Sequence, residues 1–77
     1  MPHIHVKIVG KTEEEKVTLS AAITQAIKEA TGASEEYISV CIEGVDKTDW
    51  FEKVYRPDIL GHWDNLYKKP GYDPLAK

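Results

Sequence analysis

Two stretches of alternating apolar and polar residues flank one amphipathic helix pattern, and this order constrains the fold more than any other feature. In residues 2–9 and again in residues 37–43, every second side chain is apolar, which is typical of strands with one buried face. Between them, apolar residues recur every three or four positions, which predicts a helix with one apolar stripe. A strand, a helix and a strand in this order favour a β-α-β unit with parallel strands and a right-handed crossover.

The ends of the helix are marked by local signals. Thr12 is a good N-cap, and Glu15 three residues later completes a capping box. Gly32 is the expected stop, so the helix should run to about Thr31. The predicted apolar stripe consists of Leu19, Ile23, Ala26, Ile27 and Ala30.

The strands should present one apolar and one polar face. The face expected under the helix consists of Ile4, Val6, Ile8, Ile38, Val40 and Ile42. The opposite face consists of His3, His5, Lys7, Ser39, Cys41 and Glu43. This polar row contains residue types that bind zinc, but such spacing on an exposed strand is more typical of a solvated face, so we expect no metal. Cys41 in mid-strand is likewise typical of packing and not of a nucleophile.

Residues 46–77 have a different character. They contain both tryptophans, the only phenylalanine and three of the four tyrosines. Asp49 is expected to cap a short helix from Trp50 to about Arg56 that Pro57 ends or kinks, and Asp58 to cap a second helix. A turn should follow at 69–72. Because a two-stranded sheet and one helix offer little core, we expect the aromatic side chains at a subunit interface.

Composition narrows the function classes. The 77 residues make one small domain, 1–77, with a β-α-β core at 2–45 and an aromatic-rich C-terminal segment at 46–77. The net charge of −3 without a basic block argues against nucleic acid as a partner. No apolar run is long enough for a membrane span, and the single Cys41 fits a reducing cytoplasm.

Pro2, directly after Met1, is the candidate catalytic residue. An initiator methionine is usually removed before a small residue, and its removal would leave the ring nitrogen of Pro2 as a free secondary amine. An ordered strand would hold this amine in place. Without trimming, the nitrogen is an amide and Pro2 simply starts a strand.

Several segments together carry a resemblance. They are the proline after Met1, Gly10-Lys11, the helix opening Thr-Glu-Glu-Glu-Lys and the second strand Ser-Val-Cys-Ile. With the stretches at 47–50 and 67–72, the chain resembles the 4-oxalocrotonate tautomerase family, closest to its short dimeric PptA-type members. The resemblance implies an α/β (α+β) β-α-β subunit with short C-terminal helices, whose dimer forms a four-stranded sheet.

The resemblance also implies site residues. Pro2 matches the general base, Lys11 falls where a substrate-binding arginine is common, and Trp50 matches an aromatic wall of the active site. Cys41 departs from the pattern, because the best-known members place there a second arginine that polarises the substrate carbonyl. Lys11, Lys47, Arg56 or a backbone N–H of the neighbouring subunit would have to replace it.

These observations predict an isomerase: a cofactor-independent tautomerase that moves a proton on a small enol or 2-oxo acid similar to phenylenolpyruvate. One alternative is a non-catalytic dimeric module of the same fold. Another is a hydratase or dehalogenase activity in which protonated Pro2 acts as an acid. We expect a homodimer instead of a trimer of dimers, because stacking the polar strand face would bury ionisable groups.

Overall fold

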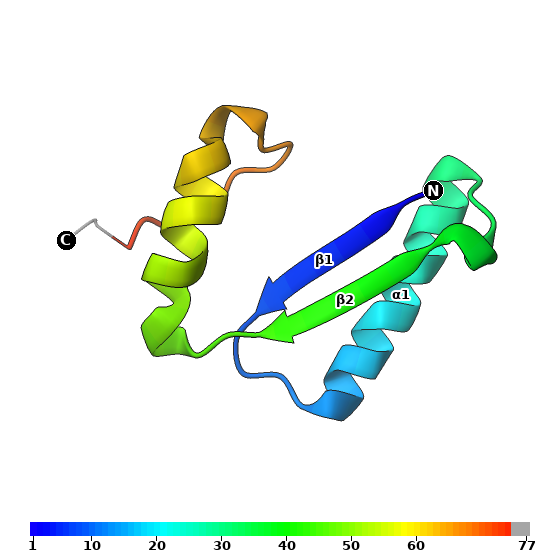
Figure 1. Ribbon diagram of the computed structural model, residues 1–77, viewed down its shortest axis with the longest axis horizontal. Coiled ribbons are helices and arrows are strands. Elements are labelled where there is room, and N and C mark those ends of the chain that lie inside the picture. The colour runs from blue at the N-terminus through cyan, green and yellow to red at the C-terminus, as the bar shows by residue number, and fades with distance from the viewer. Residues whose placement is uncertain (75–77) are drawn as a thin grey trace. The chain divides into compact units, whose positions relative to one another are not determined.

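A computed structural model describes residues 1–74; residues 75–77 of the predicted C-terminal segment lie outside the described residues. Figure 1 shows the order of the elements along the chain. They are β1 (His3–Ile8), α1 (Glu13–Thr31), η1 (Glu35–Tyr37), β2 (Ser39–Gly44), η2 (Lys47–Asp49), η3 (Phe51–Ile59) and η4 (Leu60–Asn65). The chain forms two compact units, Met1–Val45 and Asp46 onward.

The first unit is a β-α-β unit, as the sequence predicts. β1 and β2 are parallel, in a register that places His3 opposite Ser39 and Ile8 opposite Gly44. Helix α1 lies against one face of the two strands (Figure 1). β2 begins two residues later than expected, because Glu35–Tyr37 forms a 3-10 turn in which the N–H of Ile38 donates to the carbonyl of Glu35 at 3.1 Å.

The predicted ends of α1 are confirmed. The N–H of Glu15 donates to the Thr12 hydroxyl at 3.1 Å, and the Thr12 N–H donates to the Glu15 carboxylate at 3.0 Å. These reciprocal bonds satisfy donors that a helix start leaves without intrahelical partners. At the other end, Gly32 adopts a φ of 74°, a left-handed conformation that glycine adopts without a steric penalty.

Packing in the first unit is incomplete within a single subunit. Leu19, Ile23 and Ile27 are half-buried on the helix, whereas Ala26 and Ala30 of the predicted stripe are exposed. The predicted alternation of the strands is confirmed, because their apolar residues are half-buried and the opposite row is mostly exposed. No side chain of this unit is fully buried among the residues that the structure describes.

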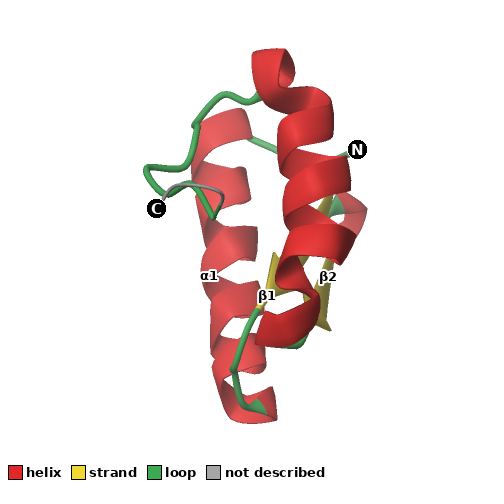
Figure 2. Ribbon diagram, turned by 90° about the vertical axis from the view of Figure 1, so that its left-hand side faces the viewer, coloured by secondary structure: helices red, strands yellow, loops and turns green. Residues whose placement is uncertain are grey.

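The second unit is helical from Lys47 to Asn65, but the helix caps predicted at Asp49 and Asp58 are wrong (Figure 2). Asp49 does not cap a helix: it lies in η2, and its carboxylate pairs with Lys53 at 3.5 Å. Pro57 does not end the helix, because it lies inside η3, a π-helix that continues to Ile59. The wider π turn relieves the clash between a proline ring and the preceding turn.

The break comes later than the sequence suggests. Asp58 lies within η3, so it does not begin a second helix. The non-helical backbone is at His62 in η4, with φ −127° and ψ 24°.

Two neighbouring side chains form the core of the second unit. Val54 is 4% exposed and Tyr55 is 2% exposed. The Phe51 ring stacks on Tyr55 at a centroid distance of 5.9 Å, and the Tyr72 ring contacts it at 5.3 Å. Burial raises the pKa of the Tyr55 hydroxyl, with a smaller contribution from the charge of Asp73.

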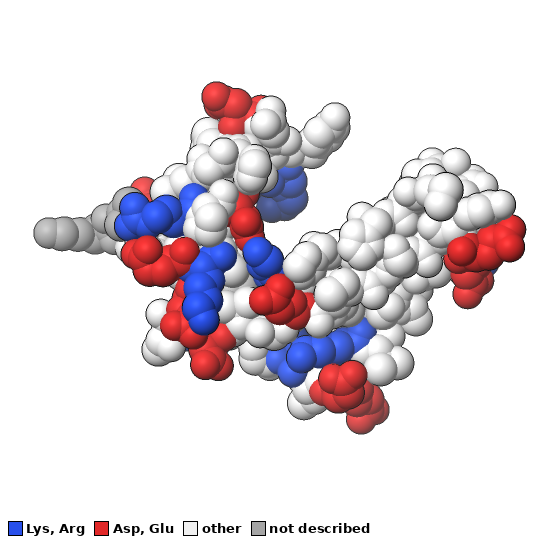
Figure 3. Space-filling model, viewed as in Figure 1, with Lys and Arg blue, Asp and Glu red and all other residues white. Residues whose placement is uncertain are grey.

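Charged groups of both signs are interspersed on the face that Figure 3 shows. In the second unit, Glu52 pairs with Arg56 at 3.2 Å, one helical turn away, in the same manner as Asp49 with Lys53. Ion pairs at this spacing and exposure contribute only a few tenths of a kcal/mol each, about 0.3–0.5. They keep this surface mixed in charge and do not explain the fold.

Candidate active site

Pro2 lies at the start of β1 and is held by the sheet. Its carbonyl accepts a hydrogen bond from the N–H of Ser39 at 3.2 Å, so the ladder between the strands extends to this residue. Pro2 is half-buried beside a hollow of about 510 Å3. The hollow is lined by Met1, Pro2, Thr31, Gly32 and Ala33, which places Pro2 close to the C-terminal end of α1.

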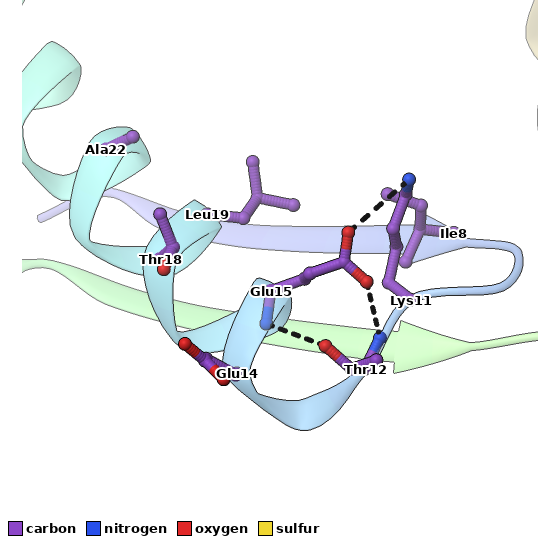
Figure 4. Close-up of a pocket in the computed structure, with 8 residues that line it drawn as sticks. All are labelled: Ile8, Lys11, Thr12, Glu14, Glu15, Thr18, Leu19 and Ala22. Carbon is purple, nitrogen blue, oxygen red and sulfur yellow. Dashed lines mark hydrogen bonds and ion pairs between the residues drawn. The ribbon is translucent and has the colours of Figure 1, made fainter.

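Lys11 lies at the mouth of a larger open groove of about 720 Å3 (Figure 4). The groove is lined by Ile8, Lys11, Thr12, Glu14, Glu15, Thr18, Leu19 and Ala22. Ile8, Leu19 and Ala22 give the lining an apolar part, and Lys11 supplies its cation. The ammonium of Lys11 lies 3.8 Å from one oxygen of Glu15, whose other oxygen accepts the capping bond from Thr12.

Glu15 therefore holds both the helix start and Lys11. Hydrogen bonds from the Thr12 backbone and side chain lower the pKa of the Glu15 carboxyl, and the charge of Lys11 lowers it further. The carboxylate thus stays charged at neutral pH and orients the lysine. Sequence analysis missed this role, although the spacing of four residues between Lys11 and Glu15 is a signal that could have found it.

Pro2 and Lys11 lie at opposite ends of the same strand. β1 has six residues, which at about 3.3 Å per residue separates the two by about 20 Å. A small substrate cannot contact both in one subunit.

Trp50 is half-buried in the second unit and has a defined partner there. Its indole N–H donates to the Tyr72 hydroxyl at 2.9 Å. The Tyr55 hydroxyl in turn donates to the backbone carbonyl of Tyr72 at 3.3 Å. The sequence gives no signal for this contact, because Trp50 and Tyr72 are 22 residues apart and follow no shared periodicity.

The polar strand face is internally hydrogen bonded. His3 Nδ1 lies 2.6 Å from the Ser39 hydroxyl, and His5 Nε2 lies 3.0 Å from a carboxylate oxygen of Glu43. Cys41 is a free, exposed thiol. Within residues 1–74, no group of three or more His, Cys, Asp or Glu side chains is placed to hold one metal ion.

The comparisons with known proteins decide the family. The sequence model of the family described as tautomerase enzyme matches residues 2–55, which include the β-α-β unit, Lys11 and Trp50. The chain belongs to the tautomerase family. Enzymes of this family are isomerases, and the parallel β-α-β fold of this tautomerase agrees with that assignment.

The alignments with two curated relatives cover almost the whole of this chain. A probable tautomerase of Xylella fastidiosa is 38% identical over 77 residues, covering 99% of this chain and 94% of that protein. Tautomerase PptA of Pectobacterium carotovorum is 38% identical over 74 residues, covering 94% and 97%. A solved 4-oxalocrotonate tautomerase isozyme of Methylibium petroleiphilum superposes with a TM-score of 0.61 at 38% identity, covering 64% of this chain and 81% of that one.

One finding bears on membranes. None of the helices in the described part of the chain has the length and apolar character needed to cross a bilayer.

Proposed function

We propose that this tautomerase interconverts the enol and keto forms of a small 2-oxo acid similar to phenylenolpyruvate, with Pro2 as the general base after removal of Met1. The observation that carries the proposal is the placement of Pro2. It directly precedes an ordered strand and is tied to β2 through Ser39. A terminal amine at this point is a base on a rigid support.

The chemistry needs no cofactor. A general base works best when its pKa lies near ambient pH, and an ordinary secondary amine is more basic than that. Burial of the amine by a neighbouring chain and nearby cations would disfavour its protonated form. The neutral nitrogen then takes a proton from the enol hydroxyl or the carbon beside the carbonyl, and returns it at the other position of the same substrate. The atoms balance without an outside donor.

Lys11 is the proposed substrate-binding cation. Because Pro2 and Lys11 lie at opposite ends of β1, a complete site needs Lys11 from a second copy of the chain. An antiparallel arrangement of two subunits along a sheet edge would bring the start of one β1 near the end of the other. Both strands of the two-stranded sheet have an open edge, which favours such pairing.

The proposed assembly is a homodimer. The β-α-β unit has no fully buried side chain of its own, and Ala26 and Ala30 are exposed on its helix. A second subunit would bury this surface, as small domains often require. Sedimentation equilibrium at neutral pH should give the mass of two chains. A hexamer mass would show that the polar strand face packs, and a stable monomer would refute the shared site.

Retention of Met1 gives the sharpest test of the mechanism. A form that keeps Met1 has an amide at Pro2, so it should lose the proton-transfer activity on phenylenolpyruvate that the trimmed form has. Mass spectrometry of the intact protein identifies each form. Equal turnover by both would refute the role of Pro2. Pro2→Ala is the companion variant: it keeps a primary amine and should retain residual activity.

One observation favours a second candidate, in which protonated Pro2 acts as an acid in hydration or dehalogenation. Pro2 shares a hollow with Thr31 and Gly32 at the C-terminal end of α1. The partial negative charge of a helix C-terminus stabilises a cation. A pH profile separates the two: a base gives activity that rises through the amine pKa, and an acid gives activity that falls.

A cytoplasmic location is part of the same proposal. Cys41 is a free thiol with an exposed side chain. A reducing compartment keeps such a thiol from forming disulfides between molecules.

A further inference from the structure

The ammonium of Lys11 has a charged neighbour that does not hydrogen bond to it. Its nitrogen lies 3.8 Å from an oxygen of Glu15, beyond the about 2.7–3.2 Å that an N–H···O hydrogen bond spans. A lysine ammonium carries donors only, and Glu15 leaves them unused. The Lys11 side chain is 45% exposed, so a ligand can reach these donors. A ligand carboxylate can therefore make the short, charge-assisted bond that Glu15 does not make.

The Glu15 carboxylate is fixed in place by the start of α1. Its other oxygen accepts the Thr12 N–H at 3.0 Å, and the Glu15 N–H donates to the Thr12 hydroxyl at 3.1 Å. Figure 4 shows the carboxylate directed at Lys11. The hydrogen bonds from Thr12 lower the pKa of Glu15, so the group is negative at neutral pH. A carboxylate that binds to Lys11 thus lies beside a fixed negative charge.

The charges that line this groove do not balance. Its lining contains one lysine, Lys11, but two glutamates, Glu14 and Glu15. The first carboxylate of a ligand is attracted by Lys11, whereas a second one meets only negative charge. The apolar part of the lining suits an apolar body next to the bound carboxylate. It consists of Ile8, Leu19 and Ala22.

We infer that Glu15 makes this groove selective for small ligands that carry one carboxylate and an apolar body. The inference deepens the proposed function and rests on it in one respect, namely that Lys11 binds the carboxylate of the substrate. Glu15 offsets part of the charge of Lys11, which limits the affinity for one carboxylate. Together with Glu14 it repels a second carboxylate. Glu15 is thus a specificity-determining residue and takes no part in the movement of the proton.

Two unreactive acids test the selectivity of the parent protein. The monocarboxylate is 3-phenylpropanoate, and the dicarboxylate is 3-(4-carboxyphenyl)propanoate, which adds a charge at the far end of the ring. Neither has an oxo group beside the acid, so neither undergoes proton transfer and Pro2 does not enter the result. Isothermal titration calorimetry at low ionic strength, where screening is weak, should give a Kd at least about threefold lower for the monocarboxylate.

Glu15→Gln tests the residue itself. Glutamine also completes a capping box, so the variant keeps the helix start and loses only the charge. We expect the Kd of the monocarboxylate to fall at least about threefold and that of the dicarboxylate to fall further, so that the selectivity shrinks. Glu13→Gln is the matched control, because Glu13 lies in the same turn of α1 but does not line the groove. Both Kd values should stay within about 1.5-fold in this control.

A double variant tests whether the effect passes through Lys11. In a Lys11→Ala background the monocarboxylate should bind more weakly, and Glu15→Gln should strengthen its binding by a smaller factor than in the parent. Circular dichroism checks that each variant is folded. If Glu15→Gln is unfolded, Glu15→Ala replaces it with the same expectations, because alanine has a high helix propensity and no charge.

Four results would overturn the inference. They are equal affinity of the parent for the two acids, unchanged or weaker binding of the monocarboxylate to the folded Glu15 variant, an equal gain in the Glu13→Gln control, and no binding of either acid to any variant. The last result would show that the groove is not a carboxylate site, for example because a second copy of the chain covers it.

Failure of the proposed function has a separate signature. If Lys11→Ala changes neither the Kd of the monocarboxylate nor the KM for phenylenolpyruvate, Lys11 does not bind the substrate and both proposals for this groove are wrong. If Lys11→Ala weakens binding but Glu15→Gln does not strengthen it, only the role of Glu15 is wrong. If retention of Met1 leaves turnover unchanged while the binding results hold, only the role of Pro2 is wrong.

Discussion

The two units of this tautomerase achieve order in different ways. The first unit has regular strands and a 19-residue helix with both ends capped, yet none of its described side chains is fully buried. The helical part of the second unit consists of short 3-10 and π segments, yet Val54 and Tyr55, the two buried hydrophobic residues among residues 1–74, both lie there. Regular secondary structure and a finished core are therefore separate properties.

The difference has a physical basis. Caps and backbone ladders in the first unit satisfy polar groups locally, but hydrophobic stabilisation scales with the apolar area removed from water. The exposed alanines of α1 show area that a single subunit does not remove. In the second unit, Tyr55 gathers Phe51 and Tyr72 around one ring, which buries apolar surface despite irregular backbone.

The largest effect on stability should come from a substitution in the core of the second unit. Val54→Ala removes two methyl groups from a side chain that is 4% exposed, which should cost about 2 kcal/mol of unfolding free energy. Val17→Ala in α1 is the matched control, because Val17 is 62% exposed and the change should stay within about 0.5 kcal/mol. Urea unfolding measures both. Equal losses would break the contrast between the units.

The next effect concerns substrate binding in the first unit. Lys11→Ala should raise KM for phenylenolpyruvate about tenfold, equivalent to about 1.4 kcal/mol, by removing the partner of the carboxylate. Its stability should change little, because an exposed ion pair such as that of Lys11 with Glu15 contributes little to the free energy of unfolding. Lys28→Ala, which removes a comparable pair with Glu35, should leave KM unchanged. An unchanged KM for Lys11→Ala would move the anion site to Lys47, Arg56 or Lys68–Lys69.

A smaller effect should follow from the helix start. Thr12→Ala removes the acceptor of the Glu15 N–H, which should cost about 1 kcal/mol. Thr18→Ala lies inside the same helix and should be neutral or slightly stabilising, because alanine has the higher helix propensity. Thermal unfolding followed by far-ultraviolet circular dichroism, which reports helix content, compares the melting temperatures of the two variants. Equal melting temperatures would mean that α1 depends on packing and not on its cap.

The smallest effects should be on the pH dependence of stability, which is expected to differ between the two units. The pKa of Glu15 lies below its ordinary value of 4.5, so its contribution to stability is present above that pH and is lost as the pH falls through the lowered value. The pKa of Tyr55 lies above its ordinary value of 10.0, so its contribution is present below pH 10.0 and is lost as the pH rises toward and through the raised value.

Two variants should each remove one of these dependences. Glu15→Gln keeps a capping side chain without the charge and should weaken the acid dependence. Tyr55→Phe keeps the ring without the titrating hydroxyl and should weaken the alkaline dependence. Tryptophan fluorescence reports the second unit, since Trp50 and Trp63 both lie there, and far-ultraviolet circular dichroism reports mainly α1. If Glu15→Gln changed the alkaline dependence, or Tyr55→Phe the acid dependence, the roles given to these two residues would be contradicted.

Local signals made the first unit predictable. Thr12, Glu15 and Gly32 act on backbone groups within four residues, so their roles in α1 follow from the sequence. The same kind of reasoning failed at Asp49 and Pro57. Asp49 pairs with Lys53, and the π turn tolerates Pro57 inside η3, because the helix there is held by packing of Val54 and Tyr55.

The candidate site also has features that follow from local sequence signals and features that depend on the tertiary structure. The order of the elements places Pro2 at the start of a strand and Lys11 after its end, and this much the sequence determined by itself, because strand periodicity and caps are local. Only the tertiary structure joined Trp50 to Tyr72 across 22 residues, whereas the contact of Lys11 with Glu15 follows from their spacing of four residues. Contacts between side chains distant in sequence depend on how the backbone returns on itself, and no local periodicity encodes that path.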